Sequence, residues 1–157
     1  MIPVDFDPLA LGRFHAVDVP VWGEIGVTVG TLRDRLGSGV SATDRRPEIA
    51  ARWGIWRAEK QSRLRDDCGR GVSSSVVFAA MTRHVPANAI MPVDVGNNAY
   101  SFGRYFECAE QSVLMSGYLG SIGFAFPAAM GAWAATLGND PRFRGRPVVS
   151  VSGDGGF

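Results

Sequence analysis

The sequence has 157 residues, of which 46% are hydrophobic, enough to bury one ordinary globular core. Its 16 basic residues nearly balance its 15 acidic residues, a balance that predicts neither a nucleic-acid partner nor binding to an anionic membrane surface. No basic region leads into an apolar run at the start, and the apolar stretch 122–137 is too short and too interrupted by glycine and proline to cross a bilayer. With Cys68 and Cys108 far apart and expected to be reduced thiols, these features predict a soluble cytoplasmic protein without a membrane segment.

Residues 1–37 are expected to be the end of a larger α/β domain. Two short strands are predicted over residues 2–6 and 19–22, followed by a helix over about residues 27–36. This apolar density begins without any lead-in, and we therefore interpret the segment as the tail of a domain.

Residues 38–71 form a charged inter-domain linker in our interpretation. A helical run over about residues 47–65 carries charges of both signs, which favours a solvated helix face, with a basic binding patch as the alternative. Trp53 and Trp56 lie three residues apart and so share one face of this helix. We expect them to fix the helix onto a domain.

From residue 72 onward helices and strands alternate. Ser73–Ser75 favour the start of a helix over residues 76–83, and Pro86 favours its end. The further expected elements are a strand at 90–95, a helix at 99–106, a buried strand at 113–115, a helix at 124–137 and a strand at 148–151. This alternation predicts an α/β fold, a parallel sheet with helices on both faces.

Glycine-rich turns follow three of the predicted strands, at residues 94–98, 116–123 and 153–156. In parallel sheets ligands bind beyond the carboxyl ends of the strands, so the three turns should converge on one edge. The last turn, Gly-Asp-Gly-Gly, offers backbone N–H groups of the kind that hold phosphate. The carboxylate of Asp154 would repel a bare phosphate, but a Mg²⁺ ion between them removes this conflict. These turns therefore predict a metal-bridged diphosphate site, and an ordinary tight turn remains the alternative for residues 153–156.

The three turns together resemble those of the thiamine-diphosphate-dependent enzymes, in particular the pyruvate oxidase and acetolactate synthase type. The resemblance rests on Asp-Val-Gly-Asn at 94–97, on Gly-Ser-Ile-Gly-Phe at 120–124 with Pro-Ala-Ala at 127–129 and Gly-Ala at 131–132, and on Gly-Asp-Gly at 153–155. It implies that residues 72–157 are the N-terminal part of a thiamine-diphosphate-binding domain, truncated. Residues 1–37 are, more weakly, similar to the end of the central domain of such enzymes.

The resemblance also implies roles for single residues. Asp154 would ligate Mg²⁺, the carbonyl of Gly120 would accept from the aminopyrimidine, and the side chain of Ile122 would wedge between the two rings of the cofactor. The cofactor-binding set that it implies is Gly96, Asn97, Asn98, Gly120, Ser121, Ile122, Gly153, Asp154, Gly155 and Gly156. The alternative for the second turn is that Gly120 and Gly123 only permit close packing, with Ile122 in the core.

As function, the resemblance implies a fragment of an enzyme that decarboxylates pyruvate or a similar 2-oxo acid and transfers or oxidises the two-carbon unit. The activating glutamate and a further magnesium ligand of the family lie outside the matching motifs, so we expect no catalytic residue in this chain and no activity of the chain alone. The resemblance implies thiamine diphosphate and Mg²⁺ as cofactors, and a homo-oligomeric parent enzyme. FAD near Asp5, Asp7 and Asp18 is a further implication, with a turn role as the alternative for Asp7.

Two other classes of function stay open at this stage. The chain could be a non-catalytic binding or interaction protein that retains half of a cofactor domain. A nucleotide-binding doubly wound domain is less favoured, because the sequence has neither a G-x-G-x-x-G turn followed by a ribose-binding acid nor a G-x-x-x-x-G-K-[ST] motif.

Overall fold

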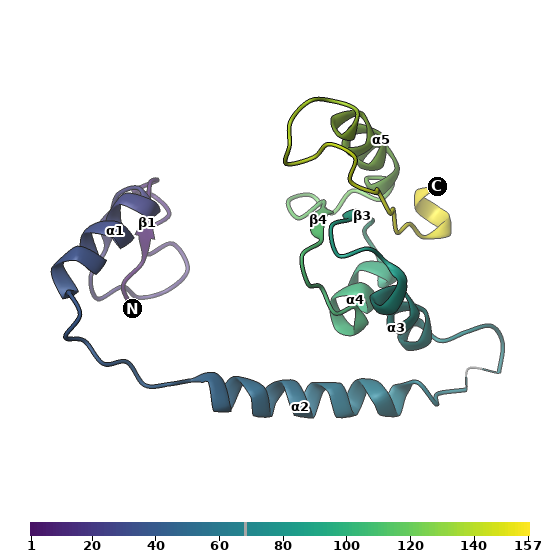
Figure 1. Cartoon of the computed structure of the whole chain (residues 1–157), viewed down its shortest axis with the longest axis horizontal. Helices are drawn as coiled ribbons and strands as arrows, with labels where there is room; N and C mark the ends of the chain where they lie inside the picture. The colour runs from purple at the N-terminus through teal and green to yellow at the C-terminus, as the bar shows by residue number, and fades with distance from the viewer. Residues whose placement is uncertain (68) are drawn as a thin grey trace. The chain divides into compact units, whose positions relative to one another are not determined.

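The computed structural model describes residues 1–67 and 69–157, so the expectation for Cys68 lies outside the described residues. The chain divides into two compact units, Met1–Pro47 and Glu48–Phe157. Figure 1 shows the elements of each unit, which are described separately below. Among the described residues, no helix combines the length and the apolar content that a membrane crossing requires.

The first unit contains a parallel pair of short strands and a helix. Strands β1 (Val4–Asp5) and β2 (Val21–Trp22) pair with Val4 opposite Val21, and α1 (Ile25–Leu36) follows. Both predicted strands are confirmed but are shorter than expected, and β2 occupies only the C-terminal half of its predicted range. Helix α1 begins where the Glu24 carboxylate accepts a hydrogen bond from the N–H of Val27, an N-cap interaction.

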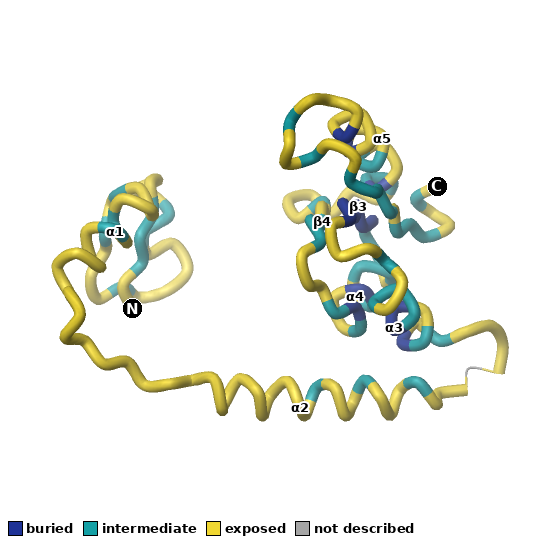
Figure 2. The backbone as a smooth tube through the Cα atoms, in the orientation of Figure 1, coloured by how far each residue is buried: buried dark blue, intermediate teal, exposed yellow. Residues whose placement is uncertain are grey.

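Helix α2 (Arg46–Arg63) confirms the charged helix predicted between the two sequence regions. Its side chains are exposed or half-buried, as a solvated helix requires, and Figure 2 shows this along the tube. The indole N–H of Trp56 donates to the carbonyl oxygen of Arg104 at 3.0 Å, and the Glu107 carboxylate pairs with Lys60 at 3.0 Å. Trp56 therefore holds the helix against the rest of the second unit, as predicted.

The second unit is built on a parallel pair of strands. Strand β3 (Ile90–Val93) pairs with β4 (Ser112–Met115), with Ile90 opposite Ser112. On the other side of β3, Val148 and Val151 form isolated parallel bridges to Ile90 and Val93. The helices of this unit are α3 (Ser74–His84), α4 (Asn97–Tyr105), α5 (Ala125–Thr136) and the short 3₁₀ helix η1 (Asp154–Gly156).

Strand β3 is buried on both of its faces. Met91 and Val93 pack in a core cluster with Phe78 of α3 and Phe102 of α4. Since side chains alternate along a strand, Ile90 and Pro92 point to the opposite face, where α5 contacts the strand. Figure 1 shows α5 on one side of the strands and α3 and α4 on the other. The predicted α/β arrangement with helices on both faces is confirmed.

Two expectations for the strands are wrong in detail. The strand at 113–115 was expected to be buried, but Leu114 is 40% and Met115 46% exposed, because β4 lies at the edge of the pair with β3. The strand expected at 148–151 is reduced to two bridges. It still forms ladder bonds on its inner side, where the N–H groups of Val149 and Val151 donate to the carbonyls of Ile90 and Pro92, each at 2.9 Å.

Candidate functional site

The three glycine-rich turns meet at the side chain of Asp94, which is 1% exposed and directly follows β3. Its carboxylate accepts from the N–H of Gly123 at 3.0 Å and from the hydroxyl of Ser152 at 2.9 Å. Gly123 ends the second turn, and Ser152 precedes the third. The predicted convergence of the turns on one edge of the sheet is thus observed, and one buried carboxylate joins them.

Asp94 is held as an anion. Burial by itself raises the pKa of its carboxyl, but hydrogen bonds from the N–H of Val95, the Ser152 hydroxyl and the N–H groups of Gly123 and Phe124 outweigh burial and lower the pKa below its ordinary value. The carboxylate therefore carries its full charge at neutral pH. Its negative charge balances the partial positive charges of the N–H groups that the turns direct toward it.

The third turn lies so close to Asp94 that it requires glycine. A Cβ atom at Gly156 would stand 2.1 Å from Oδ2 of Asp94 and 3.0 Å from the Ser152 hydroxyl. Real side chains do not approach to such a distance, so any larger residue would push the turn away from the carboxylate. The backbone of residues 153–156 is therefore positioned by contact with the first turn.

The first turn leads into the N-terminus of α4. Gly96 has φ 124°, a conformation that favours glycine, and it caps the helix that begins at Asn97. The backbone N–H groups of Asn97 and Asn98 lie in the first helical turn, where no carbonyl of the helix can accept from them. The side-chain amide of Asn98 instead points back and donates to the carbonyls of Asp94 at 3.3 Å and Val151 at 3.5 Å.

The second turn presents its apolar side chain outward. Gly120 has φ 62°, and the N–H of Ser121 donates to the hydroxyl of Ser116 at 3.2 Å, which closes the turn. Ile122 is 64% exposed. Its side chain is therefore accessible rather than part of the core, against the packing alternative.

In the third turn, η1 displays Asp154 at the surface. Its carboxylate accepts from the N–H of Gly155 at 3.0 Å, and the N–H of Gly156 donates to the carbonyl of Gly153 at 3.1 Å. No group of three or more His, Cys, Asp or Glu side chains is placed to hold a metal ion among the described residues. Asp154 and the neighbouring amides nevertheless suit one part of a diphosphate–magnesium site, since carboxylate oxygen suits Mg²⁺ and amide N–H groups suit phosphate oxygen.

Sequence reasoning missed two residues of this arrangement, Asp94 and Ser152. Asp94 appeared in the first motif without a role of its own. The available signal was a carboxylate placed immediately after a continuous apolar strand, a position where burial forces a charged group to find partners. Ser152 carries no comparable signal, because serine next to a glycine turn is common.

Comparison with known proteins agrees with this geometry. Residues 94–157 match the family described as "Thiamine pyrophosphate enzyme, C-terminal TPP binding domain". The match begins at Asp94 and contains all three turns. The residues that the structure gathers around Asp94 therefore lie within the matched range.

The whole chain is also similar to full-length proteins. It is 29% identical to a probable acetolactate synthase large subunit of Methanocaldococcus jannaschii, with 100% of this chain and 26% of that protein covered. It is 28% identical to a catabolic acetolactate synthase of Raoultella terrigena, again over 100% of this chain and 27% of that protein. A sulfoacetaldehyde acetyltransferase of Rhodobacter capsulatus is 27% identical, with 100% of this chain and 28% of that protein covered.

The chain thus spans about a quarter of the length of the relatives that it matches. Both findings confirm the resemblance predicted from the three motifs. The chain is similar along its length to thiamine-diphosphate-dependent enzymes of the acetolactate synthase type, and its residues 94–157 match their thiamine-diphosphate-binding domain.

Proposed function

We propose that this chain supplies one part of the thiamine-diphosphate site of an enzyme that decarboxylates pyruvate or a similar 2-oxo acid and then transfers or oxidises the two-carbon unit. The observation that carries this proposal is the gathering of three glycine-rich turns around the buried Asp94, within the residues that match the cofactor domain. When bound, thiamine diphosphate supplies the electron sink that decarboxylation requires. The chain by itself is inactive in this proposal.

The diphosphate would be held from two sides. The N–H groups of Asn97 and Asn98 at the start of α4, together with Gly96, would meet it from one turn, helped by the positive end of the helix. Gly153, Gly155 and Gly156 would meet it from the other turn. Asp154, exposed on η1, would ligate the Mg²⁺ that neutralises the phosphate charge.

The second turn would orient the organic part of the cofactor. In this proposal the carbonyl of Gly120 accepts from the aminopyrimidine, Ser121 lies beside it, and Ile122 wedges between the two rings. The exposure of Ile122 supports this role, because a side chain packed in the core could not contact a ligand. A β-branched residue suits a wedge, since its χ1 rotation is restricted.

The domain assignment also belongs to this proposal: residues 1–37 as the end of a central domain, 38–71 as a linker and 72–157 as part of the cofactor domain. We further propose a homo-oligomeric enzyme in the cytoplasm without a nucleic-acid partner. FAD near Asp5, Asp7 and Asp18 has support from the resemblance alone. Asp5 accepts from the N–H of Asp7 at 2.8 Å and Asp7 from the N–H of Leu9 at 2.9 Å, as turn-forming aspartates do.

A second candidate, the non-catalytic interaction protein, has an observation in its favour. Large apolar side chains follow one another along α5 at helical spacing and are more than half exposed: Phe126, Met130 and Trp133, with Leu137 just beyond the helix. Exposed apolar stripes of this kind mark interaction surfaces. They do not by themselves identify a cofactor.

Calorimetric titration of the full chain with thiamine diphosphate, with and without Mg²⁺, tests the two candidates. A partial site predicts weak, Mg²⁺-dependent binding with a Kd on the order of 1 mM. Asp154→Ala should remove the Mg²⁺ dependence, whereas Asp140→Ala, which removes an exposed carboxylate paired with Arg142, should leave it intact. Micromolar, saturable binding of thiamine diphosphate would favour the non-catalytic binding or interaction protein. Binding that depends on neither Mg²⁺ nor Asp154 would refute the proposed site.

A further inference from the structure

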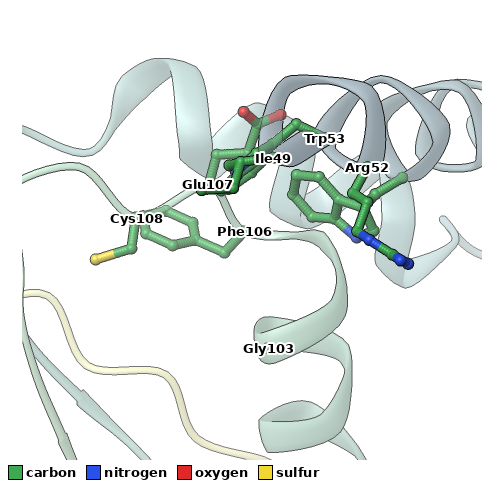
Figure 3. A pocket seen from close by; sticks show the side chains of 8 residues that line it. Ile49, Arg52, Trp53, Gly103, Phe106, Glu107 and Cys108 are labelled. Carbon is green, nitrogen blue, oxygen red and sulfur yellow. The ribbon is translucent and has the colours of Figure 1, made fainter. Parts of the chain in front are cut away.

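A groove of about 490 Å³ lies between α2 and the C-terminal part of α4 with the loop that follows it, and nothing in the proposed function uses it. Its size is within the range of small-molecule sites. Figure 3 shows its side chains, with Trp53 and Arg52 from α2 and Phe106 and Cys108 from the loop. We propose that this groove binds a planar aromatic molecule that carries one negative charge.

The apolar walls of the groove are fixed before any ligand arrives. Trp56 is held by its hydrogen bond to the Arg104 carbonyl, and Trp53 lies edge-on against it with ring centroids 5.1 Å apart. Phe106, 6% exposed, stacks on Phe102 at 4.7 Å between centroids. Because these contacts already order the rings, a flat ligand would lose little free energy to rearrangement on binding.

The charges around the groove favour an anion. The Glu107 carboxylate lines the groove and is paired with both Arg57 and Lys60, each at 3.0 Å. These two cations lie over the rings of Trp53 and Trp56 rather than in the lining itself, and the cluster of three residues keeps one surplus positive charge beside the groove. Arg52 lines the groove as well; its guanidinium lies 3.6 Å from the Glu48 carboxylate and is 79% exposed, so it is able to turn toward a ligand. This surplus positive charge would repel a cationic ligand.

Gly103 is the residue of α4 that faces the open space of the groove. It lines the groove, and a Cβ atom built there would meet no other atom within 4 Å. A larger residue at 103 would therefore enter the open space without disturbing the helix, and a helix interior tolerates leucine better than glycine. This makes position 103 suitable for blocking the groove while the fold is kept.

The test uses the full chain with Trp22→Phe and Trp133→Phe, so that Trp53 and Trp56 provide the fluorescence, and naphthalene-2-sulfonate as the probe. We expect saturable quenching, about tenfold weaker binding after Gly103→Leu, and binding about fivefold weaker both for neutral naphthalene-2-sulfonamide and after Arg52→Gln. Gly131→Leu is the matched control, because Gly131 of α5 also has no atom within 4 Å of a Cβ. Circular dichroism shows whether each variant is folded.

Cys108 provides a second readout, since its thiol is exposed at the groove. In a Cys68→Ser background, saturating probe should slow alkylation of Cys108 by iodoacetamide at least threefold, and Gly103→Leu should abolish this protection. The proposal is overturned if quenching does not saturate, if Gly103→Leu binds as well as the unchanged chain, or if charge has no effect. Protection that grows with protein concentration while the probe fails to bind would assign the groove to a second copy and also overturn it. Neither readout depends on thiamine diphosphate, so failure here leaves the cofactor proposal untouched.

Discussion

At the scale of single residues, Asp94 determines how the site is assembled. A carboxylate that is 1% exposed would be costly without partners, and here they are supplied by N–H groups of the first two turns and by the Ser152 hydroxyl, which directly precedes the third. Because the buried charge needs these hydrogen bonds, they hold Gly123 and Ser152 at the end of β3. The glycines of the turns allow the backbone to come this close.

Replacing Asp94 by asparagine tests this constraint. The change keeps the shape of the side chain but removes its charge and puts an amide NH₂ against donor groups, so the free energy of unfolding should fall by about 2–4 kcal/mol. Urea denaturation measures the change, with Asp140→Asn as a control: its carboxylate is 37% exposed and paired with Arg142, so its loss should cost no more than about 1 kcal/mol. Equal stability of both variants would show that Asp94 does not hold the turns together.

The lowered pKa of Asp94 gives this residue a pH signature with a definite sign. Because the pKa of the folded state lies below the unfolded value of about 3.9, the stabilisation is complete above pH 4 and is lost as pH falls through the folded pKa. Urea denaturation between pH 2.5 and 6 should therefore show a decline below pH 4 in the unchanged chain that is smaller in Asp94→Asn. The same decline in both proteins would assign it to other carboxylates.

Gly156 and Gly155 form a matched pair for the third turn. A Cβ at Gly156 would overlap Asp94, whereas a Cβ at Gly155 would meet nothing within 4 Å. Gly156→Ala should lower the free energy of unfolding by about 1–3 kcal/mol, through forced displacement of the turn, and Gly155→Ala should change it far less. Thermal unfolding of both variants measures the difference. A Gly155→Ala variant less stable than Gly156→Ala would contradict the close contact between Gly156 and Asp94.

At the scale of elements, α2 is held against the rest of the second unit by a few polar contacts rather than by a buried face. The Glu107 carboxylate forms ion pairs with both Arg57 and Lys60. Burial raises the pKa of Glu107, but the hydrogen bonds and charges of Lys60 and Arg57 outweigh burial and bring the pKa below its ordinary value. The carboxylate therefore stays charged and the contact holds at neutral pH. A helix fastened in this way can be loosened without unfolding the core.

Glu107→Gln should loosen α2. With the anion gone, Lys60 and Arg57 lose their shared partner, and the loss of about 1 kcal/mol should appear as a red shift of tryptophan emission from Trp56 and as faster proteolysis near residues 64–67. Glu110→Gln removes an exposed carboxylate three residues away and serves as the control. If both variants keep the emission of the unchanged chain, the ionic contact does not position the helix.

At the scale of the whole molecule, the second unit leaves apolar surface uncovered. The stripe formed by Phe126, Met130 and Trp133 on α5 is more than half exposed, and the segment at 148–151 is bonded to β3 on its inner side. Exposed apolar helix faces and strand edges both promote association between chains.

Purified chain should accordingly self-associate at micromolar concentration, as measured by light scattering after size-exclusion chromatography. Trp133→Lys should reduce the association clearly, because it places a charge within the α5 stripe. Ile55→Lys changes an apolar residue of α2 that is 72% exposed, against 59% for Trp133, and should have little effect. A monodisperse monomer with a cooperative thermal transition would contradict this expectation for the unchanged chain.

The sequence by itself determined the order and type of the elements, the three glycine-rich turns and the family that they resemble. These features are local: turn residues, apolar runs and motif spacing act over a few neighbouring positions, where backbone conformational preferences dominate. That is why helices α1 to α5 lie close to their predicted ranges and strands β3 and β4 where apolar runs stand. The exact ends of the strands depend on their pairing partners: β3 ends at Val93, two residues before the predicted end, and β4 begins at Ser112, one residue before the predicted start.

Tertiary structure alone decided how distant residues meet. The contacts of Asp94 with Gly123 and Ser152, the exposure of Leu114, and the groove between α2 and α4 all join residues that lie 20 or more positions apart or depend on a neighbouring strand. No local pattern encodes the distance between such groups. Those contacts arise from packing, in which burial of β3 on both faces brings the turns to one edge and leaves Asp94 among their donors.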